Sequence, residues 1–125
     1  MPSNNMEPKK FLASYLEDFS DLVKPNEETV EKLAEVADLL KNVNSAGKKT
    51  LIFGNGGSAA IASHFSVDLT KNAGLRCVNF NEADLITCFA NDYGFERWVE
   101  KAVDFYGDEG DLLIVISSSG SSKNM

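Results

Sequence analysis

The sequence has little of several things that particular classes of protein need. Its 125 residues include two cysteines, three prolines and one histidine. No apolar run is long enough to span a bilayer, and the first ten residues are polar, without the hydrophobic core of a signal peptide. Cys77 and Cys88 lie among apolar residues without metal-type spacing, so we expect two reduced thiols in the core. These absences argue against a membrane partner and make a cytoplasmic location the expected one.

Basic residues are also scarce. Twelve lysines and arginines oppose nineteen acidic residues, which gives a net charge of −7. Such a balance argues against a nucleic-acid partner or an anionic membrane surface. It leaves a small anionic ligand open, because the N-terminus of a helix binds anions locally. With 43% hydrophobic residues, the chain should fold around one modest core.

The stretch from Leu51 to Ser58 is the one around which we expect the chain to be arranged. Residues Thr50–Phe53 predict a short buried strand, Gly54-Asn55-Gly56-Gly57 a turn, and the run from Ser58 to about Lys71 a helix. A strand, a glycine turn and a helix start together bind phosphate: the glycines lack the Cβ atoms that would keep an anion off the backbone, and the first helical N–H groups have no internal partner. The alternative is a tight turn capped by Ser58, without a ligand.

The helix after this turn carries the only histidine, His64, four residues before Asp68. At that spacing the two side chains point the same way and can reach one ion or one substrate. An isolated histidine on a helix is more often a packing or capping residue, and the nearby acid and phosphate-type loop favour a ligand or catalyst. Zinc would need at least one further protein ligand. Three apolar residues, Ile61, Phe65 and Leu69, lie on one face of this helix, and His64 and Asp68 lie on a neighbouring face.

Another strand followed by a loop of small residues is predicted near the end of the chain, and it could bind an anion in the same way. Leu112–Ile116 is wholly aliphatic, as in the middle of a parallel sheet, and six small residues, 117–122, follow it. A flexible serine linker is the alternative, but Lys123–Met125 looks like the start of another helix. Strands that alternate with helices imply a parallel sheet, whose strand ends share one edge. The two loops should therefore face each other across one crevice, with His64 and Asp68 farther along its floor.

The rest of the chain predicts further helices and one strand. We expect residues 1–8 to be disordered and residues 9–45 to form two helices, the second capped by Asn26. Their apolar stripes either cover a face of the chain's own sheet or pair with a second copy. A strand at 75–80, a helix from 82 to 90, a turn at 91–94 and a helix from 95 to 107 follow. Asp92 either caps the last of these helices or reaches a ligand hydroxyl, and we prefer the cap.

Four blocks of residues, in order along the chain, resemble the sugar isomerase (SIS) domain, and within it the phosphoheptose isomerases. They are residues 54–60, 64–70, 91–95 and 110–120. The resemblance implies an α/β fold, a three-layer α/β/α sandwich with a flavodoxin-like parallel sheet, of which residues 46–125 would form the N-terminal part. It also implies a homotetramer with active sites between subunits, in which the helices of residues 9–45 help to form the assembly.

The resemblance also implies a reaction and the residues that carry it. The reaction is the interconversion of sedoheptulose 7-phosphate and D-glycero-D-manno-heptose 7-phosphate through an enediol, which needs a carboxylate or imidazole on each side of the substrate. His64 and Asp68 would be the catalytic pair and would bind one zinc ion per site; the family normally has Glu at the position of Asp68. Contacts to the phosphorylated sugar would come from Asn55, Gly56, Gly57, Ser58, Asp92, Ser117, Ser118, Ser119 and Ser122.

Two other functions stay open. The chain stops before a late helix that carries the family's second catalytic histidine, which allows a non-catalytic SIS module that binds a phosphosugar or a protein partner. Gly54-x-Gly56-x-x-Ala59 also fits a dinucleotide-binding turn, although asparagines, Asn79 and Asn81, stand where its acid is expected. A three-stranded parallel sheet with a bare edge is a poor stopping place. We therefore expect a chain truncated at its C-terminus, or an edge that pairs with another copy.

Overall fold

The computed structural model describes residues 7–125, so the disorder expected for residues 1–8 is tested only at residues 7 and 8; it is wrong at Pro8, which is the first residue of a helix. The chain divides into two compact units, one up to Glu35 and one from Val36 onward. Within the described residues the elements, in chain order, are α1 (Pro8–Leu22), α2 (Glu27–Ser45), β1 (Thr50–Gly54), α3 (Gly57–Lys71), β2 (Cys77–Asn79), α4 (Ala83–Tyr93), the 3₁₀ turn η1 (Phe95–Arg97), α5 (Trp98–Tyr106) and β3 (Leu112–Ile116).

The first unit consists of α1 and the beginning of α2. Helix α1 begins at Pro8, whose fixed φ and missing N–H suit a first helical position. The cap expected for α2 is confirmed, because Asn26 Oδ1 accepts a hydrogen bond from the Thr29 N–H at 2.9 Å. None of the residues of α1 is buried, and its large apolar side chains are all more than half exposed: Phe11, Leu12, Tyr15, Leu16, Phe19 and Leu22.

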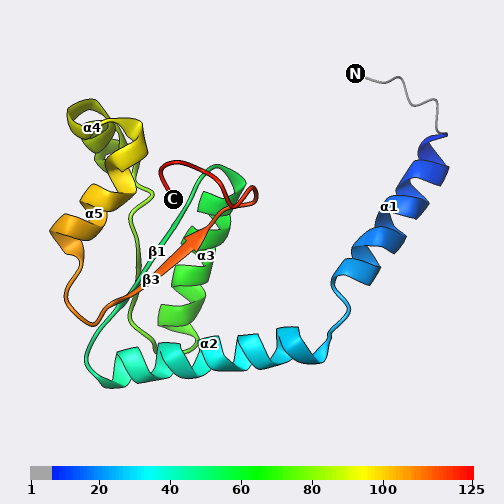
Figure 1. Cartoon of the computed structure of the whole chain (residues 1–125), viewed down its shortest axis with the longest axis horizontal. Coiled ribbons are helices and arrows are strands. Elements are labelled where there is room, and N and C mark those ends of the chain that lie inside the picture. The colour runs from blue at the N-terminus through cyan, green and yellow to red at the C-terminus, as the bar shows by residue number, and fades with distance from the viewer. Residues whose placement is uncertain (1–6) are drawn as a thin grey trace. The chain divides into compact units, whose positions relative to one another are not determined.

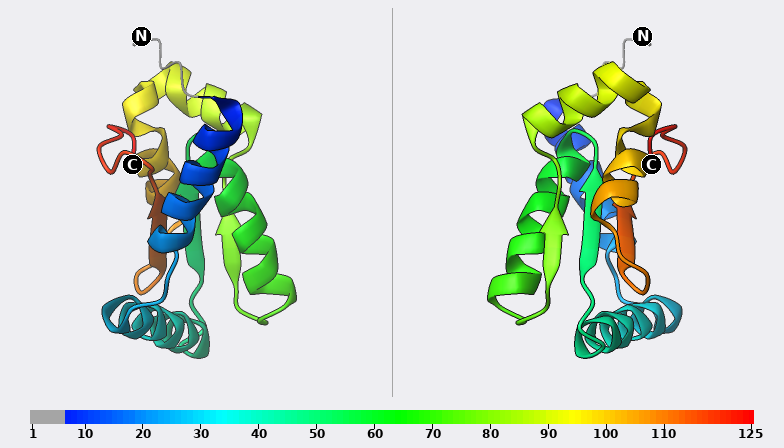
Figure 2. Two further views of the ribbon diagram at one scale, coloured as in Figure 1. Left: turned by 90° about the vertical axis from the view of Figure 1, so that its right-hand side faces the viewer. Right: turned by 90° about the vertical axis from the view of Figure 1, so that its left-hand side faces the viewer.

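The second unit is built on a parallel sheet in the order β2-β1-β3 (Figure 2). The central strand β1 is buried along its whole length, with Thr50 opposite Cys77 on one side and Leu112 on the other. Strand β3 has the expected bounds but is an edge strand among the described residues, not a middle one. Its outer edge pairs with no described strand, and its side chains are therefore only half-buried, with Leu113 46% exposed.

Helices cover both faces of this sheet (Figure 1). Helix α3 lies on one face and α4 and α5 lie on the other. Because side chains alternate along a strand, Leu51 and Phe53 of β1 pack together with Trp98 and Val99 of α5, while Ile52, also fully buried, points to the opposite face. The three-layer α/β/α prediction is confirmed, and the strand order is that of flavodoxin-like sheets.

Several expected boundaries are wrong. The strand expected at 75–80 is limited to Cys77–Asn79. Residues 91–93 of the turn expected at 91–94 are instead the last residues of α4, which ends at Tyr93; the next residue, Gly94, has a φ of 90°. Asparagine and aspartate continue a helix when its other face packs well, whereas a left-handed conformation requires glycine. Lys123 and Asn124 lie in a turn.

Two expectations from composition have mixed outcomes. Both cysteines are free, but Cys88 is exposed and only Cys77 is partly buried. Burial raises the pKa of the Cys77 thiol to about 11, which makes it a poor nucleophile. No helix in residues 7–125 is long and apolar enough to cross a membrane.

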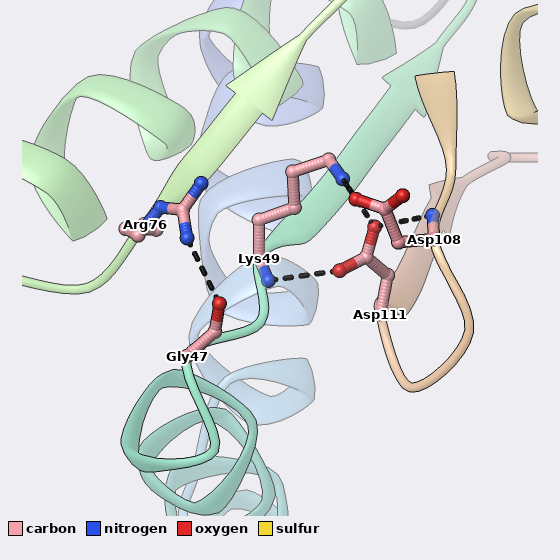
Figure 3. A network of polar contacts seen from close by, with 5 residues as sticks. All are labelled: Gly47, Lys49, Arg76, Asp108 and Asp111. Atoms are coloured by element: carbon pink, nitrogen blue, oxygen red, sulfur yellow. Dashed lines mark hydrogen bonds and ion pairs between the residues drawn. The ribbon is translucent and has the colours of Figure 1, made fainter. Parts of the chain in front are cut away.

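An ion-pair network ties β1 to the loop before β3 at the amino end of the sheet (Figure 3). The Lys49 ammonium lies 2.7 Å from Asp108 Oδ2 and 2.6 Å from Asp111 Oδ2, and the Lys49 N–H donates to Asp111 Oδ1 at 3.0 Å. The Asp111 side chain is only 6% exposed. Burial by itself would raise the pKa of Asp111, but hydrogen bonds from the Lys49 ammonium and from the Lys49 and Asp108 N–H groups outweigh it and lower the pKa to about 2.

Asp111 should make the domain less stable in acid. Because its pKa is lowered on folding, its stabilisation is complete above the ordinary pKa of 3.8 and is lost as the pH falls to about 2. The loss should be roughly 2 kcal/mol. Urea unfolding of wild type and Asp111→Asn should therefore show a difference in unfolding free energy that narrows between pH 4 and pH 2. Asp104→Asn, which removes an exposed pair with Lys101, is the control and should show little difference at any pH. If the difference in unfolding free energy between wild type and Asp111→Asn were the same at pH 4 and pH 2, the lowered pKa of Asp111 would be contradicted.

Candidate functional site

The loop after β1 has the backbone geometry of an anion site. Gly56 is the N-cap of α3, with φ +53° and ψ −121°, and no side chain caps the helix. The carbonyl of Asn55 accepts the N–H of Ser58 at 2.9 Å. Within residues 7–125, the N–H groups of Gly56 and Gly57 donate no backbone hydrogen bond, so two donors remain at the positive end of the helix dipole. The alternative of a Ser58 cap is wrong, since Ser58 lies inside the first turn.

Two asparagines hold this loop from the side of β2. Asn79 Nδ2 donates to the Ile52 carbonyl and Asn81 Nδ2 to the Gly54 carbonyl, both at 2.8 Å. The side chains thereby continue the hydrogen-bond ladder of the sheet past the end of β2. In the sequence these two residues stood out only because they occupy the positions where a dinucleotide-binding turn would have an acidic residue. Because the amides of Asn79 and Asn81 donate to backbone carbonyls of β1, these residues count against the dinucleotide-binding alternative.

The loop after β3 gathers serine hydroxyls. Ser122 Oγ lies 3.2 Å from Ser117 Oγ and 3.5 Å from Ser119 Oγ. Ser117 Oγ also accepts the Gly120 N–H at 3.2 Å, which closes the loop on itself. A shallow pocket of about 300 Å³ lies here, lined by Val115, Ser117, Gly120, Ser122 and Met125. Ser118 is exposed and takes no part in these contacts.

The two loops meet at the carboxyl edge of the sheet, as their positions after parallel strands predict. Strands β1 and β3 are neighbours, with Gly54 opposite Ile116 at their ends. Figure 2 shows all three strand arrows pointing toward this edge. Residue Asn55 of the first loop is hydrogen-bonded to Asn124, just past the second. This edge is the point where the strand order reverses, where ligands of open α/β sheets bind.

His64 and Asp68 lie elsewhere, on the outer face of α3. Their side chains are 80% and 48% exposed, and they line a separate hollow of about 460 Å³ with Ala60, Ile61 and Phe65. The expectation that they continue the floor of the serine crevice is wrong. The residues of α3 that face the core are Ala62, Ser66 and Leu69, and at 100° per residue this places positions 64 and 68 away from the sheet. For the same reason Ile61 is 59% exposed.

The pair itself has the geometry expected of neighbours one turn apart. His64 Nε2 lies 3.6 Å from Asp68 Oδ2, and Asn72 Nδ2 donates to Asp68 Oδ1 at 2.9 Å. Imidazole nitrogen and carboxylate oxygen are both ligands that zinc accepts, and Asn72 orients the carboxylate as an outer-shell partner would. In the described part of the chain, no group of three His, Cys, Asp or Glu residues could hold a metal. The two residues therefore fit part of a zinc site.

Asp92 is exposed in the last turn of α4. Its Oδ1 accepts from Asn91 Nδ2 at 2.8 Å, and Cys88 Sγ lies 3.9 Å from its Oδ2. It caps no helix, because η1 begins after Gly94 and α5 after Arg97, so the preferred interpretation as a cap is wrong. No hydrogen bond among the described residues joins Asp92 to either loop.

Fold and site together define an α/β domain with two anion-type loops at a strand-order switch. A family model described as the SIS domain matches residues 14–125, and the chain therefore belongs to the SIS domain family. A phosphoheptose isomerase of Fusobacterium nucleatum is 42% identical over 121 residues, 91% of this chain and 62% of that protein. A phosphoheptose isomerase of Aliarcobacter butzleri is 38% identical over 124 residues, 94% of this chain and 63% of that protein.

Solved structures give the same result. The structure of phosphoheptose isomerase GmhA from Neisseria gonorrhoeae has a TM-score of 0.82 at 33% identity, over 93% of this chain and 63% of that one. A phosphoheptose isomerase from Francisella tularensis has a TM-score of 0.80 at 29% identity, over 95% of this chain and 66% of that one. The chain thus spans between 51% and 63% of the length of the curated relatives that it matches.

Proposed function

We propose that this chain is part of an isomerase that interconverts sedoheptulose 7-phosphate and D-glycero-D-manno-heptose 7-phosphate. The observation that carries the proposal is the meeting of the glycine loop and the serine loop at one edge of the sheet. Free N–H groups at a helix start and a cluster of hydroxyls suit the phosphate end of such a substrate. The names of the relatives, all phosphoheptose isomerases, supply the substrate.

The reaction moves a proton between C1 and C2 of the sugar. In the ketose-to-aldose direction, a base removes a proton from C1 and the C2 carbonyl oxygen gains a proton, which gives the enediol. C2 then receives a proton while the C1 hydroxyl loses its own and becomes the carbonyl. Asp68 is our choice for one acid/base group because its carboxylate is half exposed and Asn72 holds one of its oxygens. His64, at 3.6 Å, is the neighbouring group that would stabilise the carboxylate's orientation.

Zinc belongs to this proposal with His64 and Asp68 as two of its ligands. When bound, it would polarise the oxygens of the substrate as a Lewis acid. The remaining protein ligands would come from residues outside this pair.

Assembly is the second part of the proposal. In one chain, the His64–Asp68 hollow and the serine pocket have no lining residue in common. Exposed apolar side chains on α1, and Val30 and Leu33 on α2, support pairing with other copies, for which we propose a homotetramer that completes its sites between subunits. Two free cysteines fit the cytoplasm as its compartment.

Turnover of sedoheptulose 7-phosphate by the protein at its native length is the direct test. We expect conversion that a chelator abolishes and zinc restores, and a mass in light scattering of four subunits. Fructose 6-phosphate, a shorter ketose phosphate, is the control substrate and should be converted far more slowly. Binding of sedoheptulose 7-phosphate without turnover, in the presence of zinc, would contradict the isomerase and favour a binding module.

A further inference from the structure

The side chains of Asn55 and Asn124 form a reciprocal amide pair. Asn55 Nδ2 donates to Asn124 Oδ1, and Asn124 Nδ2 donates to Asn55 Oδ1, both at 2.9 Å. The two residues are 69 positions apart and belong to the glycine loop and to the end of the serine loop. Asn124 is 8% exposed, so water competes poorly for these bonds. Two bonds in opposite directions fix the orientation of both amides as well as their distance.

The pair leaves Asn55 able to bind a ligand. An asparagine amide has two N–H donors and an oxygen with two lone pairs, and the pair uses one donor and one lone pair of each residue. Within the described residues, the Asn55 side chain makes no other hydrogen bond. One N–H and one lone pair thus remain on an amide whose plane is already set.

Asn124 is itself held from two sides. The N–H of its neighbour Met125 donates to the Ser122 carbonyl at 3.1 Å, and the Met125 side chain packs against the core cluster of Leu51, Phe53 and Trp98. Ser122 is the hydroxyl around which Ser117 and Ser119 gather. Movement of Asn124 would therefore also move the serine loop. The amide pair joins the serine loop to the glycine loop.

We propose that Asn124 is a positioning residue of the phosphosugar site, which orients the Asn55 amide and locks the two phosphate loops together before the substrate arrives. The inference rests on the function proposed above. Its physical basis is preorganisation: loops ordered in advance lose less entropy when a ligand binds. Asn124 acts through Asn55 and the serine loop, and we assign it no contact with the reacting carbons.

The first test separates binding from chemistry in the protein at its native length. Asn124→Ala should raise KM for sedoheptulose 7-phosphate roughly tenfold, the scale of one to two lost hydrogen bonds, and change kcat much less. Asn44→Ala is the matched control, because it also removes an asparagine hydrogen bond, to the Arg76 N–H, at the other end of the sheet. It should leave KM unchanged. Equal KM values for the two variants would overturn the inference.

A double-mutant cycle tests whether Asn124 acts through Asn55. Once Asn55→Ala has removed the partner, adding Asn124→Ala should raise KM little further, whereas independent effects would multiply and overturn the inference. Asn124→Leu is the second variant if Asn124→Ala does not fold, because leucine keeps the volume and has no hydrogen-bonding group. It should raise KM as the alanine variant does.

Inorganic phosphate distinguishes a failure of the positioning role from a failure of the enzyme. Its affinity can be titrated by calorimetry without turnover, and Asn124→Ala should weaken it relative to Asn44→Ala. If wild type binds phosphate but converts no substrate, and this difference is found, the positioning role stands and the isomerase falls. If wild type neither binds phosphate nor converts sedoheptulose 7-phosphate, both the positioning role of Asn124 and the isomerase activity are contradicted. Turnover in wild type with equal phosphate affinity in the two variants overturns the positioning role alone.

Discussion

Asp68→Asn should lower kcat for sedoheptulose 7-phosphate by about 10²–10⁴-fold, the usual share of a general acid/base group. Asparagine keeps the size of the side chain but cannot carry the proton between C1 and C2. The fold should survive, since the carboxylate is 48% exposed and its hydrogen bond with Asn72 spans one helical turn. Steady-state kinetics of the native-length protein in saturating zinc measures the effect.

Two companion variants make this result specific. Asp38→Asn removes another exposed carboxylate, whose partner is Lys41 at 3.3 Å, and should leave kcat within about twofold of wild type. Asp68→Glu restores the acid that the family normally has and should keep most of the activity. Zinc content, measured on each variant, separates loss of the acid/base group from loss of the metal. Wild-type kcat in Asp68→Asn, with zinc bound, would show that another group moves the proton.

Strands β1 and β3 and the loops after them followed from the sequence because their signals are local. Strand β3 has the predicted bounds, Leu112–Ile116, since five aliphatic residues between turn residues leave little room for another interpretation. The glycine turn after β1 was equally clear. The place of β3 in the sheet was not local, because it depends on which strand pairs with its outer edge, and among the described residues none does.

The face of α3 that packs on the sheet did not follow from the sequence, for a physical reason. Large apolar residues at helical spacing single out a face with Ile61, Phe65 and Leu69, but the residues that pack on the sheet are small, Ala62 and Ser66, with Leu69. Small residues let a helix approach a sheet closely, so the stripe of Ala62, Ser66 and Leu69 was the signal available. A helix that buries this stripe turns His64 and Asp68 outward.

The hydrogen bonds that shape the site lay beyond sequence reasoning. Parallel topology alone brings the ends of β1 and β3 to one edge, which sufficed to predict that the two loops meet. The Asn55–Asn124 pair and the bond from Asn81 to the Gly54 carbonyl depend on where each amide lies to within an ångström. An asparagine in a loop is also a common turn residue, so composition gave no reason to single these out.

Gly54→Ala should prevent folding or cost about 3 kcal/mol or more of unfolding free energy. A Cβ at this position would lie 2.4 Å from both the carbonyl carbon and the oxygen of Ser58 and 2.8 Å from the Ala59 nitrogen. All three atoms are backbone, so no side chain can rotate to relieve the clash. Helix α3 would have to move away from β1, on which the core is built.

Gly57→Ala is the matched control, three residues away. A Cβ there meets nothing within 4 Å, and Gly57 is the first residue of α3, where alanine is the better helix former. Urea unfolding should therefore show a stability equal to wild type or slightly higher, while phosphate affinity falls because the new methyl group shields the free N–H groups of the helix start. A Gly54→Ala variant as stable as Gly57→Ala would mean that α3 does not pack on β1 as closely as described. The two glycines thus have different roles: Gly54 is required for the packing of α3 on β1, and Gly57 leaves the N–H groups of the helix start open to a ligand.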